Sequence, residues 1–341
     1  MKFLIISVGG RAKGKQYGMG HVFRTLTLSQ ELKKYGKINY LLEDHGHAKK
    51  IIEKNNFKIF SLKKNIKFEE RITKTLELIH KLKIDCVIID WNRIEKKFVS
   101  EMKKYVKTII ITDEKNKDFQ ADLVINGFIG FKNSKIKNKF GTTCLIGPKY
   151  QILNKQFSKF KKRKKENDLL VSLGGFDEKN ISEYILKCID EINPRLKTRI
   201  ILGPATVKTK KIKNLEKKLK NTTVIQQTDK MYHEMMIANA GISGGGLTSY
   251  EFAVCDIPFV IICQHKHQLL AAKKWERMSI AKNLGMYNAT NKKKIFEFIK
   301  KLPMDGKNKK KSIIDGKGVT RIALEINKLV ATSNENKYPD F

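Results

Sequence analysis

Short apolar runs alternate along the chain with longer stretches in which apolar residues recur at helical spacing. Runs of four to six apolar residues are typical of buried strands, and helical spacing is typical of helices with one apolar face. The alternation predicts parallel sheets built from strand–helix–strand units. In the first half, the predicted strands are Phe3–Val8, Ile38–Leu42, Cys86–Ile89, Thr108–Thr112 and Leu123–Ile125, and the predicted helices include His21–Tyr35 and Ile72–Leu82.

The same rhythm restarts in the second half of the chain. Its predicted strands are Leu169–Leu173, Arg199–Leu202, Thr223–Ile225, Ala240–Ser243 and Phe259–Cys263. A length of 341 residues fits two domains of ordinary size. We therefore expect an α/β protein with domains at residues 1–150 and 168–331, a basic linker at 151–167, and a flexible tail at 332–341.

The formal net charge of +36 is extreme for a chain of this length. Lysine is spread over nearly every polar segment without a recognisable nucleic-acid-binding motif, so we expect no nucleic-acid partner. Two explanations of this charge stay open. The first is a general over-use of lysine in the proteome, and the second is attraction of the protein to an anionic substrate or an anionic membrane surface.

The chain has no run of 18 apolar residues, and its apolar beginning, Met1–Ile6, is too short for a signal peptide. Its five cysteines are widely spaced and sit mostly in apolar runs, which is typical of buried thiols in a reducing compartment. These features predict a cytoplasmic protein, and we expect it to be monomeric.

The first candidate site is a glycine-containing turn after the first strand, Tyr17-Gly18-Met19-Gly20-His21-Val22-Phe23-Arg24. Such a turn lets the backbone approach a ligand, and the following helix offers its N–H groups and positive dipole end. His21 would lie at the carboxyl edge of the sheet, where open α/β sheets bind ligands. It could act as a general base, or simply cap the helix. The turn is not a dinucleotide fingerprint, so no NAD and no other cofactor is expected.

Two further glycine turns follow strands of the second half. At Leu173–Asn180, two glycines would let N–H groups approach a diphosphate, and Asp177 could cap the next helix. No Gly-Lys-Ser/Thr follows, which argues against a P-loop. At Ser243–Glu251, four small residues would form an anion pocket at a helix start. Glu251 could then accept hydrogen bonds from both ribose hydroxyls, or be a first-turn acid favoured by the helix dipole.

Other polar residues also end predicted strands. Asp90 and Asp113 could bind sugar hydroxyls, orient His21, or cap helices. The segment Gln264–Gln268 contains two histidines but no carboxylate or cysteine, so no metal site is expected. We expect His45 and His47, beside Asp44, to lie on a loop surface.

Taken in order, the patterns Gly-x-Gly-His-x-x-Arg, Gly-Gly-x-Asp-x-x-Asn and Gly-Gly-x-Thr-x-x-Glu resemble those of the UDP-sugar hydrolases of pseudaminic acid biosynthesis. These are relatives of the lipid-II-forming N-acetylglucosaminyltransferase. The segments Ile88–Trp91 and Ile111–Glu114, followed by Asp122 and Asn126, and the interdomain segment Gly147–Leu153, followed by Phe157, are also similar to that family. The resemblance covers residues 1–290.

The resemblance implies a GT-B architecture, with two Rossmann-like parallel-sheet domains facing each other across a cleft. It also implies hydrolysis of a UDP-linked 2,4-diacetamido-2,4,6-trideoxyhexose without a metal, with His21 activating the attacking water. Implied substrate-side residues are Gly18, Gly20, Arg24, Asp90, Asp113, Tyr150 and Gln268, and implied nucleotide-side residues are Gly174, Gly175, Asn180, Ser243, Gly245, Gly246, Thr248 and Glu251.

Three departures from the family pattern leave the reaction open. The segment Gly9–Gln16 is longer and basic where the family has a short acidic one, His267-Gln268 replaces an Asn-Gln pair, and Asp256-Ile257 precedes Pro258 in place of a glycine. The alternative is an inverting UDP-sugar glycosyltransferase acting on a polysaccharide or lipid-linked acceptor. A third class is a protein that binds polysaccharide or nucleic acid without catalysis.

Overall fold

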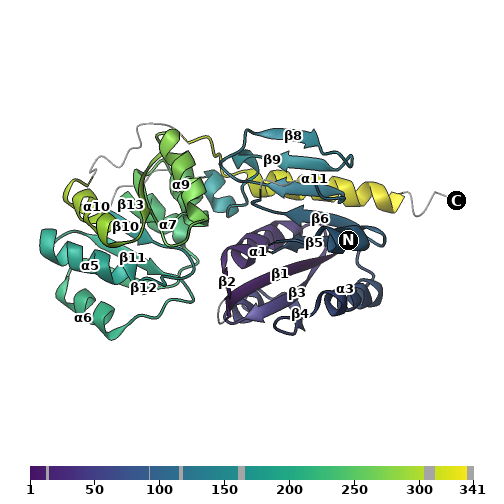
Figure 1. The fold of residues 1–341 in the computed structure, drawn as a ribbon, viewed down its shortest axis with the longest axis horizontal. Coiled ribbons are helices and arrows are strands. Elements are labelled where there is room, and N and C mark those ends of the chain that lie inside the picture. The colour runs from purple at the N-terminus through teal and green to yellow at the C-terminus, as the bar shows by residue number, and fades with distance from the viewer. Residues whose placement is uncertain (13–14, 92, 115–117, 160–165, 303–311, 336–341) are drawn as a thin grey trace. The chain divides into compact units, whose positions relative to one another are not determined.

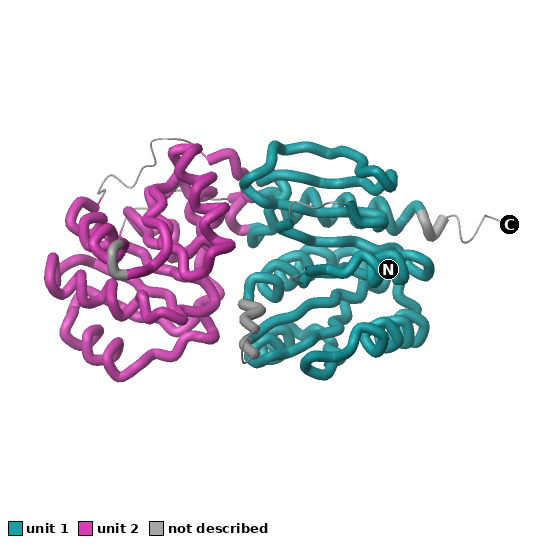
Figure 2. Tube along the Cα trace, in the orientation of Figure 1, with its two compact units in different colours: residues 1–155, 317–341 teal, residues 156–316 magenta. Residues whose placement is uncertain are grey.

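A computed structural model describes residues 1–12, 15–91, 93–114, 118–159, 166–302 and 312–335. It divides the chain into two compact units, residues 1–155 with 317–341 and residues 156–316 (Figure 2). Each unit is an α/β domain built on one sheet, as the alternating pattern predicted (Figure 1).

The sheet of unit 1 follows the order β4-β3-β1-β5-β6-β7-β9-β8, and β2 pairs with the end of β1. All neighbours are parallel except β1–β2 and β8–β9. The strands are β1 (Lys2–Ala12), β2 (Lys15–Gly18), β3 (Lys37–His45), β4 (Lys58–Leu62), β5 (Cys86–Asp90), β6 (Lys107–Ile111), β7 (Leu123–Asn126), β8 (Ser134–Lys137) and β9 (Thr143–Ile146).

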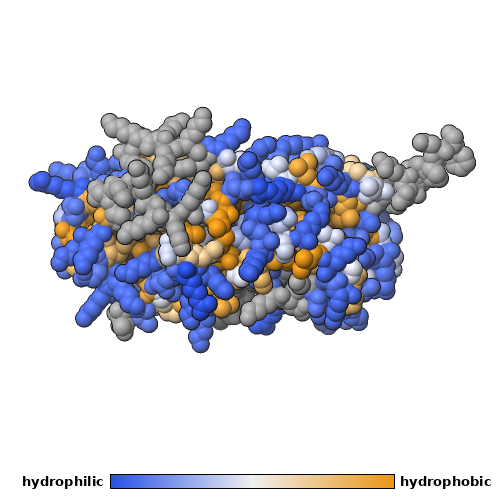
Figure 3. Space-filling view, turned by 90° about the horizontal axis from the view of Figure 1, so that it is seen from above, coloured by the Kyte–Doolittle hydropathy of each residue, from blue (hydrophilic) through white to orange (hydrophobic). Residues whose placement is uncertain are grey.

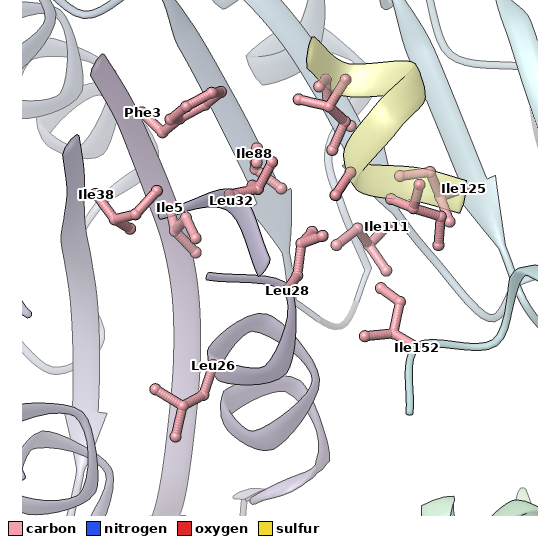
Figure 4. Packing of buried hydrophobic residues seen from close by; sticks show 14 of the residues in the cluster. Phe3, Ile5, Leu26, Leu28, Leu32, Ile38, Ile88, Ile111, Ile125 and Ile152 are labelled. Atoms are coloured by element: carbon pink, nitrogen blue, oxygen red, sulfur yellow. The ribbon is translucent and has the colours of Figure 1, made fainter. Parts of the chain in front are cut away.

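Helices cover both faces of this sheet because successive residues of each central strand point to opposite sides. Phe3, Ile5 and Ile88 pack on one side, and Leu4 and Val87 on the other. Figure 4 shows the first of these layers. The helical elements of unit 1 are α1 (Gly20–Leu32), α2 (Ala48–Glu53), α3 (Phe68–Leu82), α4 (Lys96–Lys103), the 3-10 turn η1 (Pro148–Tyr150) and α11 (Gly318–Glu335).

The last helix, α11, corrects the expected domain boundary. Residues 168–331 were expected to form one domain, but α11 belongs to unit 1. Val319, Ile322, Ile326 and Val330 are fully buried in the core layer that also contains Phe3 and Ile88. This helical spacing gives α11 an apolar face, and burying that face explains its position (Figure 4).

Unit 2 has a six-stranded, wholly parallel sheet in the order β12-β11-β10-β13-β14-β15. The strands are β10 (Asn167–Ser172), β11 (Thr198–Leu202), β12 (Thr222–Gln226), β13 (Ala238–Ser243), β14 (Phe259–Cys263) and β15 (Ala281–Met286). The helical elements are η2 (Lys155–Lys159), which enters the unit, α5 (Ile181–Ile192), α6 (Lys210–Lys218), α7 (Met231–Met236), α8 (Leu247–Val254), α9 (Gln268–Arg277) and α10 (Ala289–Lys300).

The two sheets share one topological feature. In each, the first strand in the chain lies inside the sheet, and the next strands are added first on one side of it and then on the other. The order reverses between β1 and β5 in unit 1 and between β10 and β13 in unit 2. Open α/β sheets bind ligands at such switch points, beyond the carboxyl ends of the strands. The predicted glycine turns of unit 2 follow β10 and β13, whereas that of unit 1 follows β2, the short strand that pairs antiparallel with the end of β1.

Several other expectations are decided by the fold. All five cysteines are buried and none forms a disulfide, as predicted. His45 does not lie on a loop surface: it ends β3, is buried, and its Nε2 lies 2.9 Å from Glu43 Oε1.

Part of the expected linker forms η2, in which Phe157 is buried, and residues 332–335 of the expected tail belong to α11. Residues 160–165 and 336–341 lie outside the described part of the chain. Among the described helices, none is long and apolar enough to cross a membrane.

Candidate active site

The switch point of unit 1 brings the start of α1 over the end of β5. Gly9 allows this close packing, because a Cβ there would lie 2.3 Å from Val22 Cγ2. His21 is in the first turn of α1, and Asp90 is the last residue of β5. Residues of adjacent parallel strands, Ser7 and Asp90, are in register beneath this turn.

Four side chains form a connected network at this point. His21 Nδ1 lies 2.7 Å from Asp90 Oδ1. Arg24, one turn further along α1, donates from Nε to Asp90 Oδ2 at 2.9 Å and from Nη2 to Oδ1 at 2.7 Å. Arg24 Nη1 donates to both oxygens of Asp113, at 2.7 and 2.8 Å. The carboxylate of Asp90 is fully buried, whereas the side chain of Asp113 is 52% exposed.

The network fixes the charge of its members. Burial opposes ionisation of Asp90, but the charges and hydrogen bonds of Arg24 and His21 outweigh it and lower the pKa of Asp90 to about 2. Burial likewise opposes protonation of His21, yet Asp90 raises the pKa of His21 above its ordinary value. The pKa of Arg24 is also raised, by Asp113 and Asp90 against the effect of burial.

The ionised carboxylate also selects the tautomer of His21. Asp90 has no proton to donate, so the neutral imidazole carries its proton on Nδ1 and its basic lone pair on Nε2. A buried carboxylate that orients a histidine in this way is the arrangement used by general bases. The sequence left open whether Asp90 contacts substrate or orients His21. Both of its oxygens are engaged by His21 and Arg24, which supports orientation and not the expected substrate contact.

One member of this region was missed by sequence analysis. The hydroxyl of Ser7, 1% exposed and in register with Asp90, has no hydrogen-bond partner within the described part of the chain. The signal was present as a single polar residue inside the apolar run of the first strand.

The other residues expected on the substrate side of unit 1 differ in their surroundings. Gly20 is exposed, and a Cβ there would meet nothing within 4 Å. Gly18 ends β2 and pairs with Gly10 of β1. Tyr150 is only 5% exposed and packs in the apolar core layer beneath α1 and α11. Its burial does not support the expected substrate contact, and its ring serves the core.

The switch point of unit 2 consists of two closely packed glycine turns, after β10 and β13. Gly174 adopts φ +94°, a conformation that favours glycine. A Cβ on Gly244 would lie 2.7 Å from Leu173 O, and one on Gly245 would lie 2.6 Å from Gln268 Cβ. Gly246, by contrast, is exposed and faces open space. Only small residues therefore fit where these turns meet.

The glycine turn after β10, residues 173–180, contains polar groups with partners inside unit 2. Asp177 accepts hydrogen bonds from the backbone N–H groups of Ile181 (2.8 Å) and Ser182 (2.7 Å), so it caps α5 as predicted. Asn180 is exposed and begins α5 with φ +51°. Gly175 lies against the turn after β11, because Ala205 N donates to Gly175 O at 3.1 Å.

One glutamine after β14 braces the glycine turn after β10, and a second glutamine holds the first. The buried amide of Gln264 accepts from Glu178 N at 3.0 Å and donates to Phe176 O at 2.9 Å and Leu173 O at 3.4 Å. Gln268 Oε1 in turn accepts from the backbone N–H groups of Gln264 (2.7 Å) and His265 (3.2 Å). Gln268 was expected to contact substrate. Its oxygen holds the turn that carries Gln264, and the substrate contact stays a prediction.

The helix that follows β13, α8, carries the remaining candidate residues. Ser243 is buried and donates from Oγ to Gly244 O at 2.7 Å, and Thr248 is 8% exposed. Glu251 is partly buried, and burial raises the pKa of its carboxyl group to about 7. No described residue forms a hydrogen bond or ion pair with this carboxylate.

Nothing in the described residues forms a metal-binding cluster of three or more His, Cys, Asp or Glu side chains. His265 and His267 stack with ring centroids 5.6 Å apart.

Comparison with known proteins shows what the chain is similar to. No protein-family model matches it. It is 30% identical over 285 residues to the uncharacterized protein MJ1062 of Methanocaldococcus jannaschii, covering 79% of this chain but only 57% of that relative. It is 27% identical over 283 residues to the spore coat polysaccharide biosynthesis protein SpsG of Bacillus subtilis, covering 80% of this chain and 81% of SpsG.

Solved structures share the fold at low sequence identity. MurG of Acinetobacter baumannii superposes with a TM-score of 0.61 at 13% identity, over 96% of this chain and all of MurG. The UDP-GlcNAc 2-epimerase of Neisseria meningitidis, bound to UDP-GlcNAc, superposes with a TM-score of 0.60 at 12% identity, over 96% of this chain and all of the epimerase. The chain therefore has the GT-B fold expected from its sequence.

Proposed function

We propose that the chain is a UDP-sugar-dependent enzyme of polysaccharide biosynthesis that transfers the sugar, with inversion, to an acceptor hydroxyl. The observation that carries this proposal is the network in which Asp90, held by Arg24, orients His21 at the carboxyl edge of the unit 1 sheet. Similarity to SpsG, a polysaccharide biosynthesis protein, supports the biological setting. The fold shared with an epimerase bound to UDP-GlcNAc supports a UDP-sugar as substrate.

The proposed reaction is a single displacement. His21 Nε2 accepts the proton of the acceptor hydroxyl as its oxygen attacks the anomeric carbon. The bond from that carbon to the diphosphate breaks, and its electron pair leaves with UDP. Asp90 stabilises the imidazolium formed on His21, because its carboxylate stays ionised. Asp113, half exposed beside Arg24, is free on its outer side to accept hydrogen bonds from sugar or acceptor hydroxyls.

Unit 2 would hold the UDP part of the substrate. Backbone N–H groups of the turns containing Gly174, Gly175, Gly245 and Gly246, with the start of α8, would stabilise the negative charge that develops on the diphosphate. Glu251 would accept hydrogen bonds from the ribose hydroxyls. Its carboxylate lies one turn inside α8 and lacks a partner among the described residues.

A second candidate is hydrolysis of the same class of substrate, with water as the nucleophile. The observation that favours it is the order of the three glycine motifs, which resembles the UDP-sugar hydrolases of pseudaminic acid biosynthesis. The same His21 would activate the water, so the two reactions differ in the nucleophile and not in the base.

The test measures UDP release from UDP-GlcNAc and from a UDP-2,4-diacetamido-2,4,6-trideoxyhexose. Each is assayed with and without an oligosaccharide acceptor ending in N-acetylglucosamine. We expect release that depends on acceptor and is abolished by His21→Ala, whereas His80→Ala, an exposed histidine of the same unit, leaves it unchanged. Equal release without acceptor would establish hydrolysis instead. Failure to bind UDP, or conversion of UDP-GlcNAc to an epimer without UDP release, would contradict both candidates.

A further inference from the structure

Unit 1 carries lysines along the sheet edge that lies opposite its candidate active site. Because β1, β3, β4 and β5 are parallel, their amino ends share one edge. Lys2, Lys37 and Lys58 are the first residues of β1, β3 and β4, and Lys83 lies just before β5. All four are exposed, and none forms an ion pair with a described residue. We call these four residues the lysine edge.

Two carboxylates at the same edge of the sheet accept hydrogen bonds from backbone N–H groups of its strands. Asp85 accepts a hydrogen bond from the backbone N–H of Lys2 at 2.8 Å. Asp122 accepts from Thr108 N at 2.9 Å and lies 3.4 Å from Lys107 Nζ. Neither carboxylate forms an ion pair with a residue of the lysine edge, and the ammonium of Lys58 lies 5.2 Å from the centroid of the Phe60 ring.

Two aromatic side chains accompany the lysine edge. Tyr105, before β6, is 49% exposed, and Phe140, in the turn before β9, is 47% exposed. His80 packs edge-on against Tyr105, with ring centroids 5.8 Å apart. His80 and Tyr105 line a surface depression of about 230 Å³ together with Lys83 and Asp85. Exposed aromatic rings beside lysines are typical of proteins that rest at a membrane–water interface.

We propose that the lysine edge, with Tyr105 and Phe140, docks unit 1 on the surface of a membrane containing anionic lipids. Charge complementarity carries the choice of partner. Lysines near an anionic lipid surface are attracted by its negative potential, and the two exposed aromatic rings suit the membrane–water interface, whereas no recognisable nucleic-acid-binding motif accompanies them in the sequence. Hydrophilic residues cover most of the face shown in Figure 3, with apolar residues interspersed among them.

This docking leaves the candidate active site facing away from the lipid. Asp90 and His21 lie at the carboxyl ends of the same parallel strands whose amino ends carry the lysines. A five-residue strand separates the two edges by about 16 Å. The contact therefore retains the protein at the membrane without covering the site, and it does not depend on which reaction the site performs.

The test is sedimentation of the full chain with vesicles of phosphatidylcholine, with or without about 30% phosphatidylglycerol. We expect binding only to the anionic vesicles, weakening as salt is raised. Replacing all four residues of the lysine edge by Gln should weaken binding by about fivefold for each lysine. Tyr105→Ser with Phe140→Ser should weaken it further. The matched control replaces four exposed lysines of unit 2, Lys211, Lys213, Lys217 and Lys220, by Gln and should retain most of the binding.

Three outcomes would overturn the proposal. The first is no binding to anionic vesicles, and the second is an equal loss in the matched control, which would indicate attraction by net charge alone. The third is tighter binding of a single-stranded RNA than of anionic vesicles, lost in the same variant, which would assign the edge to nucleic acid. UDP-sugar turnover should be unchanged in the lysine-edge variant, so this test and that of the catalytic proposal fail separately.

Discussion

Asp90 and His21 are separated by 69 residues in the chain, yet Asp90 Oδ1 and His21 Nδ1 lie 2.7 Å apart. The contact exists because β1 and β5 are neighbours at the point where the strand order of unit 1 reverses. Arg24 closes the arrangement with two hydrogen bonds to the same carboxylate. This pair carries the catalytic proposal, and the first two predictions follow from it.

Asp90→Asn should lower kcat by about 10²- to 10⁴-fold with little change in KM. The amide cannot stabilise the imidazolium and does not enforce a proton on Nδ1 of His21. UDP release gives the rates, and Asp85→Asn, at the opposite edge of the same sheet, is the control that should leave them unchanged. Equal loss of activity in both variants would indicate a general effect on folding.

The pH dependence of kcat/KM should show an acid limb set by His21. A general base must be neutral, so activity rises with pH through the pKa of His21, which Asp90 and its hydrogen bond raise above the ordinary value of 6.5 despite burial. Asp90→Asn removes the neighbouring negative charge, and the limb should move to lower pH. The measurement is kcat/KM between pH 5 and 9 for wild type and Asp90→Asn. If the acid limb has the same position in both proteins, a group other than His21 determines it.

Gln264→Leu should weaken UDP binding by about fivefold or more, because each lost hydrogen bond of this buried amide contributes about 1 kcal/mol to holding the turn after β10. Gln264→Glu should bind UDP poorly at neutral pH, since its carboxylate would face the carbonyl oxygens of Leu173 and Phe176. Relative to wild type at the same pH, its affinity should recover in acid, where the protonated carboxyl group can donate.

Calorimetric titration of UDP measures these affinities. The control is Asn221→Leu, which removes another amide hydrogen bond, from Asn221 Nδ2 to Arg195 O, at the far edge of the same sheet. A change in the control as large as in Gln264→Leu would assign the effect to the stability of unit 2 and not to the turn.

Ile322→Ala should destabilise unit 1 by about 2–5 kcal/mol, because Ile322 is fully buried in the core layer to which α11 contributes. Leu324→Ala, on the exposed side of the same helix, should change stability by less than about 0.5 kcal/mol. The two tryptophans, Trp91 in unit 1 and Trp275 in unit 2, allow a direct assignment. With Trp275→Phe as background, fluorescence in urea follows unit 1, and an unchanged unfolding transition of unit 1 in Ile322→Ala would contradict the position of α11.

The alternation of apolar runs with helical spacing was sufficient to predict two α/β units, and two glycine turns were correctly placed, after β10 and β13. The first glycine turn was expected directly after β1, but β2 lies between them. Both signals are local: burial on two faces makes central strands continuously apolar, and close backbone packing excludes side chains. The assignment of Glu251 to ribose, of Asn180 and Thr248 to the nucleotide, and of His21 to catalysis stays a prediction.

The sequence by itself determined which segments form strands and helices and which turns are small enough to receive an anion, because these properties depend on residues close in the chain. Only the tertiary structure decided that α11 returns to unit 1, that His45 and Tyr150 are buried, and that Asp90 orients His21 while Gln264 joins two turns. Those outcomes depend on strand order and on which apolar face covers which sheet. Strand order arises from contacts between distant residues, and the periodicity of a single chain does not specify it.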